Sequence, residues 1–295
     1  MRAFAPILVA AVLVSGCRTG ASHTHGAVAN AAGPVAVGYE IDAARPPTRF
    51  SLDIATSGEA TLFLGAPFAN TRADMAGFFR GQLAPERVAA LNAFVDDHDL
   101  RSRTGGATAT PEGSGSVRLT SGSRVSVIGL AQSDATLDSL RTMLDGIVPE
   151  IASHPWRAVR VSLSARREND SIQPELTLTH VGSDPLDVVL FDPGTPGISL
   201  RALVTLDRGD GHTETSALST DEVVSLADRG ALPRGAASMN PGASYRVVLP
   251  RLHAPAASSD SITLRADVTL WTPRPGRARR AMQARAEWHS PAGAP

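Results

Sequence analysis

The spacing of hydrophobic residues changes near residue 155, and this change constrains the fold more than any other feature of the 295-residue chain. Before this point, alternating stretches are accompanied by two segments whose apolar residues lie three and four apart, as in amphipathic helices. After it, short apolar stretches recur between turn residues, which is typical of an all-β region. The sequence therefore predicts two folded regions of different class.

The first region, residues 39–155, is predicted to be an α+β domain with two helices on one face of an antiparallel sheet. Phe50, Leu52 and Ile54 alternate with polar residues, and a Ser-Gly turn leads into a second strand. The expected strands are 49–56, 59–65, 76–83, 116–120 and 124–129, and the expected helices are 85–97 and about 133–151. This order resembles a small α+β domain of bacterial envelope proteins, a resemblance that implies no activity.

The second region, residues 156–290, is predicted to be a β-sandwich with seven short strands. The expected strands are Val159–Ala165, Glu175–Val181, Leu186–Phe191, Leu200–Leu206, Ser244–Leu249, Ile262–Leu270 and Ala281–Trp288. The segment Asn240–Tyr245 resembles the strand entry of immunoglobulin-like (Ig-like) extracellular domains, a fold shared by an intracellular proteinase inhibitor family. With one Cys in the chain, an intrachain disulfide is impossible, so the fold must depend on core burial.

The N-terminus has the pattern of a secretory signal. Arg2 precedes an apolar run, Phe4–Val14, whose eleven residues are fewer than the about 20 needed to cross a bilayer. The residues that follow, Val14-Ser15-Gly16-Cys17, resemble the lipobox of bacterial lipoproteins. This resemblance implies a signal peptide of residues 1–16, cleavage between Gly16 and Cys17, and a diacylglyceryl thioether plus an N-acyl chain such as palmitate on Cys17.

The predicted anchor places the protein in the cell envelope. Arg18, rather than Asp, follows the lipidated Cys, which in Gram-negative relatives of this class favours the outer membrane, facing the periplasm or the surface. Residues 17–38 are small and polar, so we expect a flexible tether of roughly 25 Å. Residues 291–295 are expected to be a disordered tail.

The charge balance bears on possible partners. All 28 basic residues are Arg, and they are offset by 29 acidic residues to a formal charge of −1, so no broad cationic surface favours nucleic acid. We expect the lipid bilayer, through Cys17, and an envelope protein as partners, and we expect no cofactor.

Five local patterns could be sites, but each has a simpler explanation. His23 and His25 lack further metal ligands, and the acidic run Asp96–Asp99 fits a solvated helix end because successive helical side chains diverge. Arg208-Gly209-Asp210, next to Asp207, fits a turn better than an integrin or calcium motif. The stretch Gly113–Gly115 lacks the spacing of a phosphate loop or a nucleophile elbow. The fifth pattern, Arg277, Arg279 and Arg280, fits a solvated hairpin better than a lipid-headgroup site.

No catalytic or metal-binding residue is therefore predicted, and the sequence places no Ser/His/Asp triad. Trp156, Trp271 and Trp288 are assigned to core and interface packing. Pro155 suggests a short, stiff joint between the two regions. The sequence favours a non-enzymatic binding or structural module; the alternative is a hydrolase or protease inhibitor with a cleft near Trp156.

Overall fold

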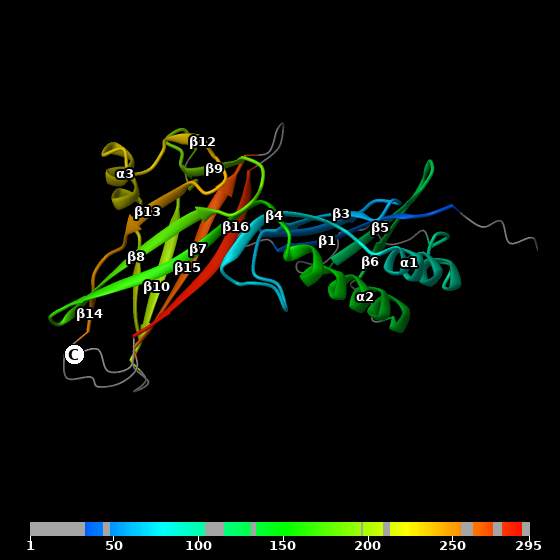
Figure 1. Ribbon diagram of the computed structural model, residues 1–295, viewed down its shortest axis with the longest axis horizontal. Coiled ribbons are helices and arrows are strands. Elements are labelled where there is room, and N and C mark those ends of the chain that lie inside the picture. The colour runs from blue at the N-terminus through cyan, green and yellow to red at the C-terminus, as the bar shows by residue number, and fades with distance from the viewer. Residues whose placement is uncertain are drawn as a thin grey trace, which may run out of the picture. The chain divides into compact units, whose positions relative to one another are not determined.

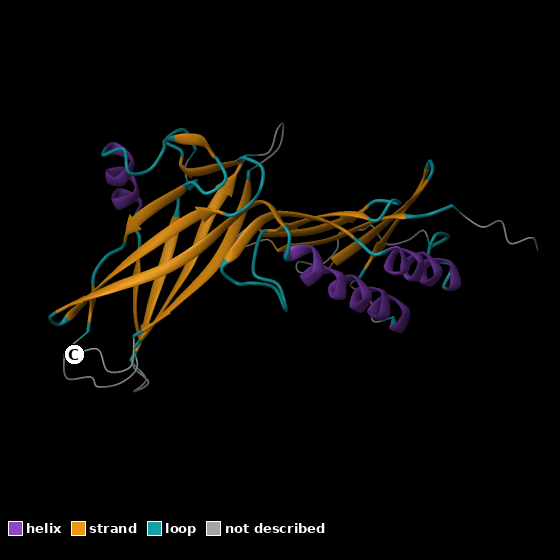
Figure 2. Cartoon of the chain, in the orientation of Figure 1, coloured by secondary structure: helices purple, strands orange, loops and turns teal. Residues whose placement is uncertain are grey.

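The computed structural model describes residues 33–43, 48–103, 115–130, 134–195, 197–208, 213–254, 262–273 and 279–290. Within these ranges the chain is mostly β, with sixteen strands and three helices (Figures 1 and 2). Residues 33–295 cluster as one compact unit. The predicted signal peptide, the lipidation site Cys17, most of the predicted tether and the C-terminal tail lie outside the described residues.

The helices are α1 (Pro85–Asp97), α2 (Ala135–Ala152) and α3 (Thr220–Asp228). The strands are β1 (Ala36–Ala43), β2 (Thr48–Ile54), β3 (Glu59–Leu64), β4 (Met75–Gln82), β5 (Gly115–Ser121), β6 (Arg124–Gly129), β7 (Pro155–Glu168), β8 (Ser171–His180), β9 (Leu186–Phe191), β10 (Arg201–Asp207), β11 (Thr213–Ala217), β12 (Gly235–Met239), β13 (Ser244–Val248), β14 (Leu252–His253), β15 (Thr263–Thr272) and β16 (Arg280–His289). None of the described helices is long and apolar enough to span a bilayer.

The strands form one connected network. The main path runs β11-β10-β15-β16-β2-β3-β4-β7-β8-β13, and β1 adds β5 and then β6 at the side of β2. The pairings between described strands are antiparallel, except for one parallel bridge between Ala281 of β16 and Thr48 of β2. Antiparallel pairing therefore dominates, as the alternating pattern predicts.

In the N-terminal half, α1 and α2 pack on one face of strands β1–β6 (Figure 2). Pro85 occupies the first turn of α1, where its missing N–H costs nothing, and Leu91 and Val95 are buried. The side chain of Asp134 caps α2 by accepting a hydrogen bond from the Thr136 N–H at 2.8 Å. The helices and the inward side chains of the strands enclose a first hydrophobic core, here called the N core.

In the C-terminal half, strands and the short helix α3 enclose a second core, here called the C core. Strands β10, β15 and β16 bury alternate side chains on one side of this core. Strands β7 and β8 bury alternate side chains on the other side. Strand β16 contacts β7 without pairing with it, so the two groups of strands pack face to face.

Strands β3 and β4 contribute to both cores because successive side chains point to opposite faces. In β4, Met75 and Phe79 belong to the N core, whereas Ala76 belongs to the C core. In β3, Leu62 belongs to the N core and Phe63 to the C core. The two cores thus lie on opposite faces of the same strands.

Three features differ from the sequence-based expectations. The predicted tether ends at Gly38, but β1 begins at Ala36, and Val35, Val37 and Tyr39 alternate as buried residues. Pro155 does not form a joint but is the first residue of β7. This strand pairs with β4, where Arg157 lies opposite Phe78. Strand β1, helix α3 and strands β11, β12 and β14 were not predicted; apart from β1, the strands among them are five residues or shorter, and α3 has nine residues.

Candidate binding groove

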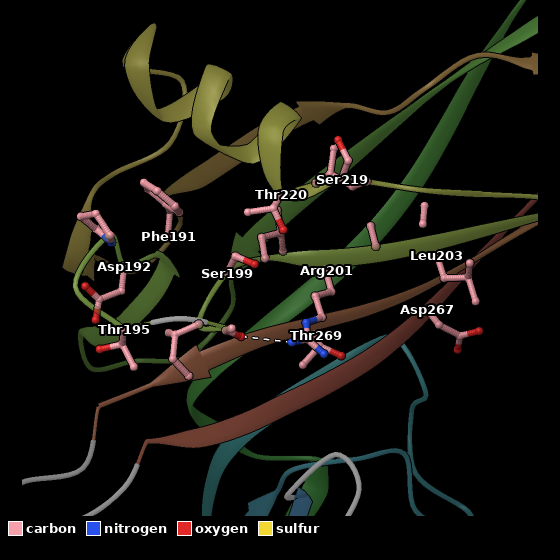
Figure 3. A pocket seen from close by; sticks show the side chains of 17 residues that line it. Phe191, Asp192, Thr195, Ser199, Arg201, Leu203, Ser219, Thr220, Asp267 and Thr269 are labelled. Atoms are coloured by element: carbon pink, nitrogen blue, oxygen red, sulfur yellow. Dashed lines mark hydrogen bonds between the residues drawn. The ribbon is translucent and has the colours of Figure 1, made fainter.

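A surface groove of about 750 Å³ lies over the first residues of β10 (Figure 3). Its lining comes from the end of β9 and the following loop 192–199, the start of β10, the turn from β11 into α3, and the outward side chains of β15. We call it the β10 groove. It lies on the outward face of the C-terminal strands, whereas the inward side chains of β10, such as Ala202 and Val204, are in the C core.

The floor of the β10 groove combines an apolar side chain with charged ones. Leu203 is 45% exposed and lies opposite Ala217 of β11 and Asp267 of β15. Asp267 accepts a hydrogen bond from the Arg285 guanidinium at 2.7 Å. Arg201, also outward, donates to the Gly197 carbonyl at 3.2 Å and is exposed to solvent. An occupant would therefore meet an exposed apolar side chain, a cation and a paired carboxylate.

One wall, the loop 192–199, is fixed by several contacts. The Asp192 carboxylate accepts a hydrogen bond from the Gly194 N–H at 3.0 Å and pairs with Arg279. The Thr195 hydroxyl, the Arg279 guanidinium and this N–H together hold the pKa of Asp192 below its ordinary value. The Trp271 indole N–H also donates to the Ser199 carbonyl at 3.3 Å. These contacts hold the described residues of this wall, 192–195 and 197–199, against the rest of the protein.

The opposite wall is the N-terminus of α3, where Ser219 and Thr220 line the groove. The Ser219 hydroxyl accepts from the Glu222 N–H at 3.2 Å, and the Glu222 carboxylate accepts from the Ser219 N–H at 2.7 Å. This capping box occupies the Ser219 and Glu222 amides, and the Ser219 hydroxyl also donates to the Glu222 carboxylate at 2.7 Å. The wall therefore presents Thr220 next to a Ser219 side chain that is already paired.

The acidic run predicted at a helix end lies where expected. Helix α1 ends at Asp97, Asp96 pairs with Arg101 at 2.6 Å, and the His98 ring packs on Phe94. Asp99 accepts a hydrogen bond from the Ser102 hydroxyl at 2.5 Å. No group of three or more metal-ligating side chains occurs among the described residues.

The basic residues singled out in the sequence make contacts within the protein. Arg208 donates to Glu214 at 3.1 Å and to the His253 carbonyl at 2.6 Å. Arg279 pairs with Asp192, and the Arg280 guanidinium lies 4.8 Å from the centre of the Phe63 ring. Within the arginine run, the guanidinium groups of Arg279 and Arg280 therefore contact other residues of the protein.

Trp271 and Trp288 pack against hydrophobic side chains, as predicted. Trp271 is 7% exposed and packs with Val189 and Ala281, and Trp288 packs against the C core. The Trp156 ring is flanked by the guanidinium groups of Arg157 and Arg80 at 4.4 Å and 5.4 Å. Several other candidates lie outside the described residues, namely Gly16, Cys17, His23, His25, Gly113, Ser114, Gly209, Asp210 and Arg277.

The described histidines occur in separate surroundings. His154 contacts the hydroxyl of its neighbour Ser153 at 2.9 Å, and His289 contacts the Thr263 hydroxyl at 3.0 Å. His180 is 1% exposed, and neither ring nitrogen has a hydrogen-bond partner in the described part of the chain. Burial lowers the pKa of His180, because the charged imidazolium would lose its hydration. The nearby Asp184 backbone has a smaller, opposite effect on this pKa.

Sequence reasoning missed the β10 groove, although two signals point to it. Leu203 is apolar but lies out of phase with the buried residues Ala202 and Val204 of its strand, which marks an exposed apolar position. Ser219 and Glu222 have the spacing of a capping box and therefore mark the start of a helix. The pairing of Asp192 with Arg279 across 87 positions has no comparable local signal.

The chain has little detectable similarity to known proteins. No protein-family model and no curated protein matches the chain. Among solved structures, the sporulation control protein Spo0M from Bacillus subtilis is similar with 9% identity and a TM-score of 0.19, covering 44% of this chain and 47% of that one. The chain thus spans about half the length of that protein, and a similarity at this level supports no inference about fold or function.

Proposed function

We propose that the chain is a lipid-anchored envelope protein that binds a protein partner in the β10 groove, without catalysing a reaction. The anchor is supported by the lipobox-like residues Val14–Cys17. The binding role is supported by one structural observation, the exposed Leu203 in the floor of a groove that is also lined by charged and hydroxyl-bearing side chains. Exposed apolar surface among polar groups is the usual composition of a protein-binding surface.

We also propose a two-part architecture for residues 33–290. The N-terminal part would be an α+β domain, and the C-terminal part an Ig-like β-sandwich in which β10, β15 and β16 oppose β7 and β8. The two cores support this division. The continuous pairing of β4 with β7 means that the parts share a sheet rather than being connected by a linker.

The groove chemistry favours a protein segment over a small anion. Both carboxylates in the groove are held by arginines, Asp192 by Arg279 and Asp267 by Arg285. Arg201 remains exposed beside Leu203. A segment with an apolar side chain next to an acidic one would match this pair of residues.

The anchor is tested by intact mass and detergent partition of the protein recovered from membranes. We expect a mass that corresponds to a lipidated N-terminal Cys17, and we expect partition into the detergent phase that Cys17→Ser abolishes. An unmodified Cys17, or a Cys17→Ser protein that still partitions with detergent, would contradict the anchor.

The groove is tested by crosslinking in intact envelope, comparing Leu203→Arg with Val248→Arg. Both positions are exposed, at 45% and 54%, but only Leu203 lines the β10 groove. We expect a reproducible crosslinked partner whose yield Leu203→Arg reduces by about tenfold, as for an interface hot spot, while Val248→Arg retains it. Equal retention by both variants would exclude the groove as the binding site.

A further inference from the structure

The tip of the β5–β6 hairpin carries an apolar patch that no part of the described chain covers. Val125 is 54% exposed and Val127 is 37% exposed, and these two make up half of the large hydrophobic side chains exposed among the described residues. Both lie on the face of β6 opposite the helices, whereas Ser126 and Ile128 point toward them and are buried. β6 pairs with β5 alone among the described strands.

The chain enters the folded region beside this hairpin. The Gly33 carbonyl accepts a hydrogen bond from Arg101 at 2.8 Å, and the same Arg101 nitrogen donates to the Ser121 hydroxyl at 2.9 Å. Ser121 is the last residue of β5, directly before the hairpin turn. The Arg101 side chain therefore joins the entry point to the end of β5.

Strand register gives the same result. Ala36 of β1 pairs with Thr120 of β5, which pairs with Val125 of β6. Since neighbouring strands lie about 4.8 Å apart, Val125 is about 10 Å from Ala36. The exposed valines are thus close to the residues that connect to the N-terminal segment.

The length of that segment limits how far the hairpin can lie from a membrane. Sixteen peptide steps separate Cys17 from Gly33, which is at most about 55 Å when fully extended. Any less extended path brings the entry point, and the hairpin beside it, closer to the lipid that holds Cys17. A lipid anchor therefore keeps this end of the folded region within about 55 Å of the bilayer.

We propose that the β5–β6 hairpin lies against the lipid surface and buries Val125 and Val127 among the acyl chains near the headgroups. This inference rests on the proposed lipid anchor. On the same face, Arg118 of β5 lies directly opposite Val127 and pairs with Asp53 across Gly38 at 3.2 Å, so the apolar patch ends at Val127, next to a charged pair. The hairpin tip is consequently the part of this face that suits lipid.

Apolar contact, rather than charge, holds the hairpin on the membrane. Arg124 is exposed at the tip. The acidic residues Asp96, Asp97 and Asp99 at the end of α1 lie near the same entry point, because Arg101 pairs with Asp96 and also contacts Gly33. These carboxylates offset attraction to anionic headgroups. We therefore expect docking on zwitterionic vesicles, and little change when anionic lipid or salt is added.

The test places an environment-sensitive fluorophore on Val125→Cys in the full chain, reconstituted in phosphatidylcholine vesicles. The matched control is Val248→Cys, because Val248 has the same 54% exposure on β13. Lipidation leaves Cys17 without a free thiol, so the introduced Cys is labelled uniquely. Nitroxide-labelled acyl chains should quench the label at 125 by about twofold, as expected for a side chain at the acyl boundary, and should leave the label at 248 unchanged.

Second variants separate docking from effects of the label. In the Val125→Cys background, Val127→Asp should abolish the quenching, whereas Val127→Ile should retain it. Equal quenching at 125 and 248, or quenching that survives Val127→Asp, would overturn the proposal. A label at 125 that changes with protein concentration in the absence of vesicles would show contact with a second copy, and would also overturn it.

Failure of the anchor can be distinguished from failure of the docking. If intact mass shows an unmodified Cys17, the proposed anchor fails by itself. The hairpin is then tested in the Cys17→Ser chain, held on vesicles by an N-terminal hexahistidine tag and nickel-chelating lipid. Quenching at 125 in this chain would support the docking surface, and its absence would overturn the docking.

Discussion

Among the described residues, a large buried polar side chain lies on the inner face of a strand in each core, and the two cores accommodate it differently. In the N core, Tyr39 is fully buried, but its hydroxyl donates to the Asp145 carboxylate at 3.0 Å. In the C core, His180 is 1% exposed and its ring nitrogens have no hydrogen-bond partner in the described part of the chain. A buried polar group without a partner costs about 1–3 kcal/mol, so the C core tolerates a defect that the N core avoids.

The difference follows from what covers each sheet. A helix such as α2 presents polar residues along its margin, and Asp145 reaches Tyr39 from there. Two facing sheets enclose their core with alternating apolar side chains, and few polar groups reach the middle. His180 lies at the last position of β8, in phase with the buried residues Leu176 and Leu178, so its ring must point inward.

The largest expected effect tests whether the cores are separable. Leu144→Ala in α2 and Leu178→Ala in β8 each remove a fully buried side chain, at a cost of about 2–5 kcal/mol in the free energy of unfolding. Because β3 and β4 contribute side chains to both cores, we expect one unfolding transition that shifts in both variants. Calorimetry showing two transitions, each sensitive to one variant, would show that the cores unfold independently.

The next prediction concerns His180. Burial lowers the pKa of His180 in the folded chain. Below about pH 6.5, the ordinary pKa of a histidine, the unfolded chain is therefore protonated at this residue more than the folded chain is. The wild-type protein should therefore lose stability as the pH falls through this range. His180→Leu should raise the free energy of unfolding by about 1 kcal/mol at pH 7.5, and by more at pH 5.

Denaturant titrations at both pH values measure this difference. His253→Gln is the control, because His253 is exposed on β14. A gain for His180→Leu that does not depend on pH would contradict the assigned titration of His180.

Tyr39 gives the smallest effect and the opposite pH dependence. Burial and the adjacent Asp145 carboxylate raise the pKa of Tyr39. Above about pH 10, its ordinary value, the unfolded chain loses a proton that the folded chain keeps, so stability should fall as the pH rises. Tyr39→Phe should cost about 1 kcal/mol at pH 7 and should weaken the alkaline loss.

The absence of Lys from the sequence keeps this alkaline range simple to interpret. Tyr245→Phe is the control, since it removes the only other Tyr. An alkaline loss of stability that is unchanged in Tyr39→Phe would show that another group is responsible.

Local patterns allowed several elements to be predicted from the sequence. Helix α1 has its predicted bounds, Pro85–Asp97, because its first-turn Pro and its three- and four-residue apolar spacing are both local signals. The predicted strand Leu186–Phe191 coincides with β9. Helix α3 is nine residues long with two buried residues, and such a short stripe gives too weak a periodic signal to predict.

The candidate site was less predictable than the fold. The β10 groove depends on Asp192 meeting Arg279 and on Trp271 meeting Ser199, which are contacts between distant segments. The hairpin patch was partly accessible, because the strand 124–129 was predicted and two valines recur in it at a spacing of two. Which face of that strand would be left uncovered could not be read from its own residues.

The sequence by itself determined the mostly β character of the chain, the positions of α1 and α2 and the lipobox-like N-terminus, because each depends on neighbouring residues. The tertiary structure decided that β3 and β4 serve two cores, that β10 carries a groove and that the chain enters beside the β5–β6 hairpin. The physical reason is that hydrophobic periodicity specifies which side chains are buried, but it does not specify which segment buries them.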